Sequence, residues 1–253
     1  MHKRFKALLL GNSIAVFLLG TYPALADLYV NEGFESNSIA GYEQETQGSG
    51  SFRIITGGGA REGSRYLSIT KNRGSSRYEL RFEQHPKPSD RWYGFSMRLP
   101  SNLPNTNEGY LVGQWHVFPD PGEAWHIPDS SINMNPDYRL TLRNAWDSRR
   151  ITPRNSTNIG RRSVPLLTMN RGNWYDFVVR YRYSYNNDGL IEIYAARAGS
   201  QLQLLQRLTG PNSFNDARGQ FRLGPYCAED DFEITIEVDA IRVGDSLDEV
   251  RPR

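Results

Sequence analysis

The sequence predicts an all-β protein, built as a two-sheet sandwich or jelly roll. Short segments that alternate apolar and polar residues recur along the chain, as in 92–99, where Tyr93, Phe95, Met97 and Leu99 share one face. Turn-forming Gly, Pro and Asn residues separate these segments, and no long stretch keeps the period of an α-helix. Many short strands joined by tight turns are typical of β-sandwiches.

Strands are expected from these patterns at residues 28–34, 50–55, 66–70, 76–82, 92–99, 110–116, 138–143, 174–183, 189–195, 201–208, 219–224 and 232–243. In the last of them the apolar side changes, which indicates a β-bulge near Asp239 and Ala240. The stretch 119–165 is rich in Pro, Asp, Asn and Arg and contains one convincing strand. Long irregular segments often serve binding, so we expect this one to form a wall of a groove.

The N-terminal residues have the pattern of a secretion signal that is removed. A basic start precedes a mostly apolar stretch at 7–19, and the small residues at 24–26 match a cleavage site. Since a membrane span needs ~20 apolar residues, a retained anchor is the less favoured alternative. We therefore predict a signal peptide at 1–26 and a single domain at 27–253, secreted or periplasmic and free of the membrane after cleavage.

Charge and cysteine content narrow the function classes. The formal net charge is +2, without the basic blocks of nucleic-acid-binding tails, so no nucleic-acid partner is expected. Arg together with Tyr and Trp suits a site that holds planar anions and stacks on sugar rings. Cys227 is the one cysteine, so no disulfide forms within the chain, and a small buried residue is favoured over a catalytic thiol. The protein is expected to be a monomer.

Three distant segments, Arg77–Arg81, Gln114–His116 and Arg222–Tyr226, place polar side chains an even number of residues apart. Alternate residues of a strand point to the same face. The residues that share a face are then, strand by strand, Arg77, Glu79 and Arg81; Gln114 and His116; and Arg222 and Tyr226. Cations beside an amide, an imidazole and a phenol are costly in a core. They fit a groove whose side chains bind a carboxylate and transfer a proton next to it.

This set of side chains matches the needs of β-elimination at a uronic acid. The carboxylate must be neutralised so that the C5 proton becomes acidic, a base must remove that proton, and an acid must protonate the leaving oxygen at C4. Arg77 or Arg81, with Gln114, can neutralise the carboxylate. His116 or Tyr226 can be the base, depending on which side of the ring the proton lies, and Tyr226 can be the acid.

Two further residues have supporting roles, and ordinary structural explanations compete with the site. Arg222 can stabilise the Tyr226 phenolate, and Glu79, between two arginines, is expected to orient them. Taken singly, an Arg-x-Glu-x-Arg strand is more often a solvated salt-bridge ladder, and a tyrosine at a strand end is common in cores. The combination on three strands of one exported β protein favours a site.

The same three segments resemble motifs of the jelly-roll polysaccharide lyases. Arg77–Arg81 resembles their Arg-x-Glu-Leu-Arg signature, Gln114–His116 their Gln-x-His element, and Arg222–Tyr226 their Lys-x-Gly-x-Tyr element. The resemblance spans nearly the whole mature chain and is to the group of alginate lyases, glucuronan lyases and heparin lyase I-like proteins, within which the glucuronan and heparin lyase-like branch is most similar. It implies a β-jelly roll, a concanavalin-like sandwich whose concave sheet forms a substrate groove.

The resemblance also implies roles for individual residues. Arg77, Gln114 and His116 would bind and neutralise the uronate, with His116 as a candidate base, and Tyr226 would be the acid or both acid and base. The supporting residues would be Glu79, Arg81 and Arg222. Because the family has Lys where this chain has Arg222, and Arg does not transfer protons, Arg222 is expected to give electrostatic support alone.

A structural calcium ion is a further implication of the resemblance. Jelly rolls of this kind join an N-terminal segment to a C-terminal strand through such an ion, here 31–35 and 238–243. Glu32 and Asp239, with backbone carbonyls, could supply the oxygen ligands that calcium needs, although ordinary exposed acids explain them equally well. No organic cofactor is expected, and no His/Cys spacing suggests zinc.

The predicted function is an exported lyase that cleaves an acidic polysaccharide containing uronic acid, in the first place glucuronic acid, by β-elimination. The main alternative is a non-catalytic carbohydrate-binding jelly-roll module for acidic polysaccharides, which needs no His116 and Tyr226 together. A glycoside hydrolase is disfavoured because it needs two carboxylates that flank the bond, and the sequence offers only Glu229-Asp230-Asp231 in a turn. The particular polyuronate and the endo or exo mode do not follow from the sequence.

Overall fold

The computed structural model describes residues 28–85, 90–156, 158–215, 218–227 and 232–253. The predicted signal peptide at 1–26 lies outside this range. In the described part of the chain, no helix is long and apolar enough to cross a membrane.

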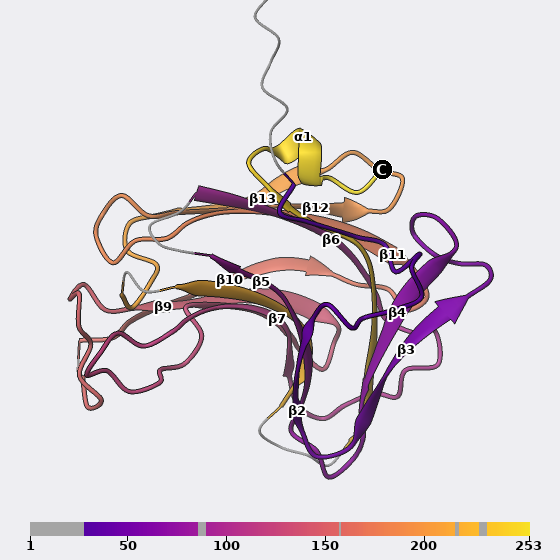
Figure 1. Cartoon of the computed structure of the whole chain (residues 1–253), viewed down its shortest axis with the longest axis horizontal. Coiled ribbons are helices and arrows are strands. Elements are labelled where there is room, and N and C mark those ends of the chain that lie inside the picture. Colours follow the sequence, from indigo (N-terminus) through magenta and orange to yellow (C-terminus); the bar gives the residue numbers. More distant parts are fainter. Residues whose placement is uncertain (1–27, 86–89, 157, 216–217, 228–231) are drawn as a thin grey trace, which may run out of the picture.

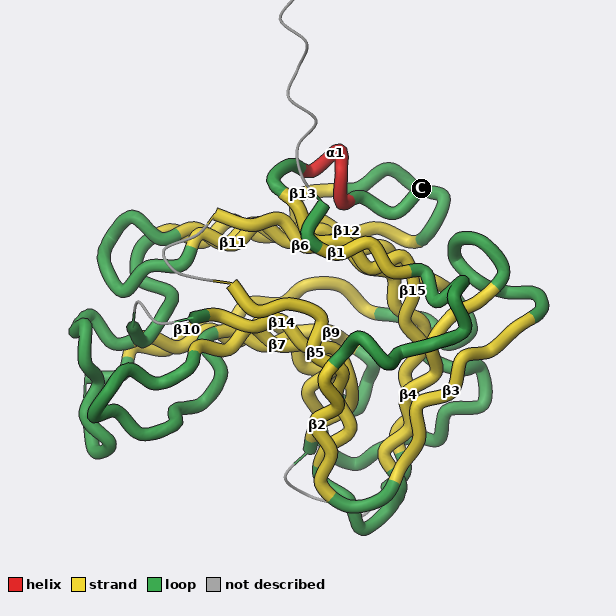
Figure 2. Tube along the Cα trace, viewed as in Figure 1, coloured by secondary structure: helices red, strands yellow, loops and turns green. Residues whose placement is uncertain are grey.

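Two antiparallel sheets face each other as a jelly-roll-like sandwich (Figures 1 and 2). The sheet that we call the back sheet has the strand order β13 (Gln203–Thr209), β12 (Leu190–Arg197), β11 (Trp174–Arg182), β6 (Asp90–Arg98), β15 (Ile234–Gly244), β4 (Arg65–Lys71) and β3 (Gly50–Thr56), and β1 (Val30–Glu32) pairs with β15. A short helix, α1 (Leu247–Val250), follows β15 and contacts the back sheet.

The second sheet, which we call the groove sheet, has the order β10 (Gly160–Thr168), β9 (Arg139–Trp146), β8 (Ser130–Met134), β7 (Tyr110–Val117), β14 (Gly219–Tyr226), β5 (Arg77–His85) and β2 (Glu43–Gln47). It bends between β7 and β2, so that its outer face, away from the back sheet, is concave (Figure 2). The jelly-roll architecture with a concave sheet agrees with the prediction.

Apolar residues at alternate positions of both sheets build the core between them. Trp115 of β7 and Phe221 of β14 are fully buried and stack with ring centroids 5.2 Å apart. Phe221 also packs 5.0 Å from Tyr93 and 5.8 Å from Phe95, both on β6 of the back sheet. Because alternate residues point to opposite faces, this packing turns the residues between them onto the concave face.

The expected strands are all present, and the β-bulge of β15 is confirmed. The register of β15 against β6 shifts between Asp239 and Arg242, and Ala240 adopts a positive φ of 52°. This extra residue lets apolar residues before and after it, such as Val238 and Ile241, both point into the core.

Three strands of the groove sheet, β2, β8 and β10, were not predicted. The prediction of one strand in 119–165 was therefore wrong, since β8 and most of β10 also lie there. For two of them the cause is composition: β2 reads Glu-Gln-Glu-Thr-Gln without an apolar residue, and β10 carries Pro165 within it. Both are edge strands, where neither an apolar face nor every backbone N–H is required.

Candidate functional site

The three strands that carry the predicted site residues are direct neighbours, in the order β7, β14, β5. Arg222 in β14 lies opposite Gln114 on one side and Arg81 on the other, and Tyr226 lies opposite Arg77. All three strands present these residues on the concave face, since the alternate residues are in the core. The structure thus brings together the whole predicted set, from Arg77 to Tyr226.

Buried Glu79 lies at the centre of this cluster. Its side chain is fully buried, Gln114 Nε2 donates a hydrogen bond to its Oε1 at 2.5 Å, and Arg77 Nε lies 3.2 Å from its Oε2. Burial raises the pKa of Glu79 to about 7, although these partners favour the charged form. The prediction that Glu79 orients its neighbours agrees with this geometry.

Gln114 has no exposed surface in this arrangement. Its Oε1 has no hydrogen-bond partner among the described residues, and its amide nitrogen is bonded to Glu79. The predicted direct contact between Gln114 and a substrate carboxylate would require its neighbours to move. As it stands, Gln114 fixes the carboxylate that in turn fixes Arg77.

The cation that lies beside the Tyr226 phenol is Arg77, not Arg222. The guanidinium carbon of Arg77 lies 4.1 Å from the centroid of the Tyr226 ring. Burial lowers the pKa of Arg77, but Glu79, Glu45 and the Tyr226 phenol raise it overall, so its charge is firmly held. The expected support of Tyr226 by a cation is present, and a different arginine provides it.

Arg222 is held by other partners. Its Nη1 pairs with Glu45 of β2, and its Nε donates to Gln220 Oε1 at 3.3 Å. Gln220 Oε1 also accepts a hydrogen bond of 2.9 Å from Arg81 Nη1. Burial lowers the pKa of Arg222, yet the neighbouring carboxylates Glu45 and Glu79 oppose this shift. Gln220 thus joins Arg222 and Arg81 by hydrogen bonds in the floor of the groove.

Three residues of this network, Glu43, Glu45 and Gln220, escaped the sequence analysis. Glu45 Oε2 accepts a hydrogen bond of 3.0 Å from Arg77 Nη1 and pairs with Arg222, and Glu43 pairs with Arg81. The even spacing of Glu43 and Glu45 was readable, but nothing marked the all-polar segment 43–47 as a strand. Gln220 stands two residues before Arg222, and the rule of even spacing could have found it.

His116 is buried beneath a loop. Its Nδ1 lies 2.7 Å from the carbonyl oxygen of Val117, its Nε2 lies 3.1 Å from that of His126, and the Trp125 ring packs edge-on with centroids 5.3 Å apart. Burial lowers the pKa of His116 to about 4. A neutral imidazole carries one N–H, so it donates to one of the two carbonyls only. Removal of a substrate proton by His116 would require the His126 carbonyl to move away.

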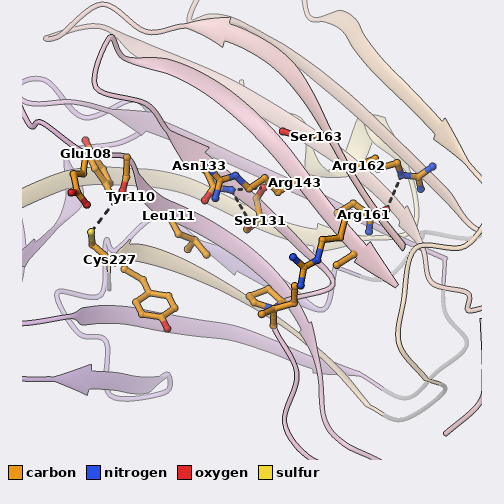
Figure 3. Close-up of a pocket in the computed structure, with 16 residues that line it drawn as sticks. Glu108, Tyr110, Leu111, Ser131, Asn133, Arg143, Arg161, Arg162, Ser163 and Cys227 are labelled. Atoms are coloured by element: carbon orange, nitrogen blue, oxygen red, sulfur yellow. Dashed lines mark hydrogen bonds between the residues drawn. The ribbon is translucent and has the colours of Figure 1, made fainter. Parts of the chain in front are cut away.

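Tyr226, by contrast, lines an open cavity of about 710 Å³ that extends over β8, β9 and β10 (Figure 3). This volume lies in the range of ~300–1,000 Å³ that ligand sites occupy. Gly224 sets the position of Tyr226: it has a φ of +146°, and a Cβ there would lie 2.1 Å from the Tyr78 carbonyl oxygen. Only glycine permits this close approach of β14 and β5.

A loop forms one wall of the cavity, as predicted for the stretch 119–165. Ile127 and Pro128 line the cavity from this side. Glu123 anchors the loop: its Oε2 accepts a hydrogen bond of 2.6 Å from Asn215 Nδ2, and its Oε1 accepts one from the Thr152 N–H. Two other loops therefore hold this wall in place.

Glu32 and Asp239, the predicted calcium ligands, serve as hydrogen-bond acceptors. Asp239 Oδ2 accepts the backbone N–H groups of Arg61 and Glu62 at 2.8 and 3.0 Å, and its Oδ1 accepts that of Ala240 at 2.7 Å. Glu32 accepts the N–H of Phe34. The described residues contain no group of three His, Cys, Asp or Glu that could hold a metal. Because calcium also takes backbone carbonyl oxygens as ligands, the calcium site stays a prediction.

Cys227 is buried with 6% of its surface exposed, and its Sγ lies 3.7 Å from the Gly109 carbonyl oxygen. It packs in the core cluster, which agrees with the prediction of a small buried residue.

The family model described as Polysaccharide lyase matches residues 39–242 of the chain. This range contains every residue of the cluster around Glu79. The chain belongs to this family, and the protein is a polysaccharide lyase, which confirms the resemblance seen in the sequence.

Solved structures share the fold at low identity. An endo-β-1,4-glucuronan lyase from the fungus Trichoderma reesei superposes with a TM-score of 0.69 at 18% identity, over 88% of this chain and 97% of that one. An alginate lyase from Aplysia kurodai gives 0.55 at 11% identity, over 76% and 86%. An alginate lyase from Chlorella virus gives 0.56 at 7% identity, over 86% and 99%. No curated protein sequence matches the chain.

Proposed function

We propose that this lyase cleaves a polysaccharide of glucuronic acid, or a closely related polyuronate, by β-elimination, with Tyr226 as the residue that moves protons. The observation that carries the proposal is the position of Tyr226. It lines the groove, and the charged Arg77 guanidinium lies 4.1 Å above its ring. The buried members of the cluster hold Arg77 in place.

Arg77 is the group that neutralises the substrate carboxylate. About a quarter of its side chain is exposed, and its Nε and Nη1 pair with Glu79 and Glu45. A guanidinium has five N–H donors, more than these two carboxylates use, so Arg77 can also receive a substrate carboxylate. Neutralising this charge makes the C5 proton of the uronate acidic.

Tyr226 then performs both proton transfers. Its phenolate takes the C5 proton, the C5–H electrons form the C4–C5 double bond, and the C4–O bond breaks. The same phenol returns a proton to the leaving oxygen, so no proton is gained or lost overall. Arg77 stabilises the negative charge on the phenol oxygen during this cycle. His116, neutral and turned toward two carbonyls, supports the loop that carries Trp125.

We also propose that the protein is exported and acts as a monomer on polysaccharide outside the cytoplasm. The basic, apolar and small-residue pattern of residues 1–26 supports export.

The test is to incubate the purified protein with glucuronan, alginate and a glycosaminoglycan and to follow the ultraviolet absorbance of the unsaturated uronate product. We expect product from glucuronan. Tyr226→Phe should lower kcat by ~10²–10⁴-fold, the usual contribution of general acid–base catalysis, with unchanged affinity for an oligouronate measured by calorimetry. His116→Asn is the matched variant and should keep kcat within about tenfold, because the wild-type imidazole is directed at backbone carbonyls.

Two results would contradict this mechanism. If His116→Asn abolishes turnover while Tyr226→Phe retains it, His116 is the base. If no polyuronate gives product although each binds, the proposed cleavage of polyuronates is wrong, and binding without cleavage is what the alternative of a carbohydrate-binding module predicts.

A further inference from the structure

The groove sheet carries arginines of two kinds. Near the β2 edge, the arginines of β5 and β14 have internal carboxylate partners: Arg77 pairs with Glu79, Arg81 with Glu43 and Arg222 with Glu45. On β9 and β10, Arg143 and Arg161 are exposed, and neither guanidinium has a hydrogen-bond or ion-pair partner among the described residues. Charge on this side of the groove is therefore not neutralised by the protein itself.

Both free arginines line the same cavity as Tyr226. Arg143 lies opposite Ser163 on β10, and Arg161 stands two residues before Ser163 on the same face. Such diagonal neighbours lie ~7–8 Å apart, within the reach of long side chains. Two like charges at this distance repel each other, so an anion held between them would relieve that repulsion.

The third arginine of the cavity, Arg162, differs from the other two because all its nitrogens are bonded within the protein. Its Nε donates to Asn144 Oδ1 at 2.8 Å, and its Nη1 and Nη2 donate to the carbonyl oxygens of Thr209 and Pro211 at 2.9 and 3.2 Å. Arg162 thus ties β10 to a loop beyond the back sheet strand β13. Arg143 and Arg161 make no such bonds within the described structure.

Polar groups beside Arg143 complete a saccharide site. Ser131 lies opposite Arg143, and Asn133 Nδ2 donates to Ser131 Oγ at 2.8 Å (Figure 3). This bond turns the Asn133 side chain within the cavity wall, where its carbonyl oxygen can accept a sugar hydroxyl. Ile127 and Pro128 give the same cavity an apolar wall, which suits the C–H faces of a sugar ring.

The site at Arg143 lies far from Tyr226, the proposed catalytic residue, when measured across the sheet. Tyr226 is on β14 and Arg143 is on β9, three strands away. Neighbouring strands lie ~4.8 Å apart, so the separation is roughly 14 Å, well beyond the width of one pyranose ring. A group bound at Arg143 therefore belongs to a sugar unit remote from the bond that is cleaved.

From these observations we infer that Arg143 and Arg161 form a second anion site, which binds the carboxylate of a uronic acid unit several residues away from the cleaved bond. The inference rests on the proposed function, since it takes the ligand to be the same acidic polysaccharide. It makes the enzyme selective for chains that carry a charge on distant units as well as at the reacting unit.

The test compares short and long β-1,4-linked oligoglucuronates in the Tyr226→Phe background, so that the ligand is not consumed. Arg143→Ala with Arg161→Ala should weaken hexamer binding by at least about tenfold and leave trimer binding within about twofold. In otherwise wild-type protein, the same pair should raise KM for the hexamer with unchanged kcat. Arg53→Ala, which removes an exposed arginine from β3 of the back sheet, is the matched control and should change neither.

A carboxyl-reduced hexamer, which is neutral, separates charge recognition from sugar contact. It should bind equally to both proteins, with and without the arginine pair. Hexamer affinity that is unchanged in the double variant, or an equal loss for trimer and hexamer, would overturn the inference. If the proposed function is wrong, the unmutated protein gives no unsaturated product. The comparison of binding by the variants does not depend on that result.

Discussion

Arg180 and Asp90 form an ion pair of 2.8 Å on the back sheet with about a third of each side chain exposed, whereas Arg222 and Glu79 on the groove sheet are almost completely buried. Exposed pairs contribute ~0–1 kcal/mol and tolerate change. Buried charges lose their hydration and stay stable only when every partner is in place. The buried cluster of the groove sheet therefore gives up stability that the exposed Arg180–Asp90 pair keeps, and in exchange Arg77 and Tyr226 are held in fixed positions.

The largest expected effect comes from Gly224→Ala in β14. The new Cβ would lie 2.1 Å from the Tyr78 carbonyl oxygen, and the backbone φ of +146° is open to glycine alone. We expect a loss of ~2–5 kcal/mol in the free energy of unfolding, from strain and overpacking together, and a loss of most activity because β14 also carries Tyr226. Urea unfolding and turnover measure both.

Gly199→Ala on the back sheet side is the matched control for Gly224→Ala. Gly199 also has a positive φ, +83°, but a Cβ at this position would meet no atom within 4 Å beyond its chain neighbours. It should lose ~1–2 kcal/mol from strain alone and keep full activity. Equal losses in the two variants would mean that backbone strain, and not the close approach of β14 to β5, makes Gly224 necessary.

The same contrast between the sheets explains which parts could be read from the sequence. On β6, the alternation of Tyr93, Phe95 and Met97 with other residues predicts the strand, because these three side chains form its core face. On β2 both faces are polar, so no period is visible even though Glu45 is central to the network. A strand of the groove sheet is visible in the sequence only where an apolar core face accompanies the polar face.

Within the site, the sequence predicts which residues share a face but not which of them touch. Even spacing placed Arg77, Glu79 and Tyr226 together correctly, because side-chain direction in a strand follows from residue number alone. The pairing of Arg77 with Tyr226, in place of Arg222 with Tyr226, depends on the register between β5 and β14. Register is set by contacts between distant segments, which one sequence does not reveal.

Glu79→Gln, the next largest effect, tests whether the buried charge holds the site. We expect kcat to fall by about 10–100-fold because Arg77 loses a carboxylate partner, and Tm to respond to pH. Burial raises the pKa of Glu79 from 4.5 to about 7, so the folded protein binds more protons than the unfolded chain between these values, and the contribution of Glu79 to stability is lost as pH rises through this range. The Glu79→Gln variant should not show this loss of stability, because glutamine does not titrate.

Relative to wild type, the Tm of Glu79→Gln should therefore be higher at pH 8 than at pH 5, by a few degrees, since 1 kcal/mol corresponds to ~2–4 °C in a chain of this size. Calorimetry across this pH range gives the difference. Glu237→Gln, which removes the partner of Arg98 on the back sheet, is the control and should leave turnover unchanged. A Tm difference that falls with rising pH would show that Glu79 is charged and stabilising throughout.

Glu45→Gln is expected to have the smallest effect. It tests whether β2, an edge strand that the sequence did not predict, contributes to the site. Glu45 is about a quarter exposed and shares its carboxylate between Arg77 and Arg222. Its removal takes one partner from each cation, so we expect KM to rise or kcat to fall by about 3–10-fold, and stability to change by less than ~1 kcal/mol. Glu43→Gln removes a more exposed partner, that of Arg81, and should change turnover less. If the two variants have the same effect, β2 contributes only negative charge near the site. If Glu45→Gln alone lowers activity, the sharing of one carboxylate between two arginines sets the position of Arg77 over Tyr226.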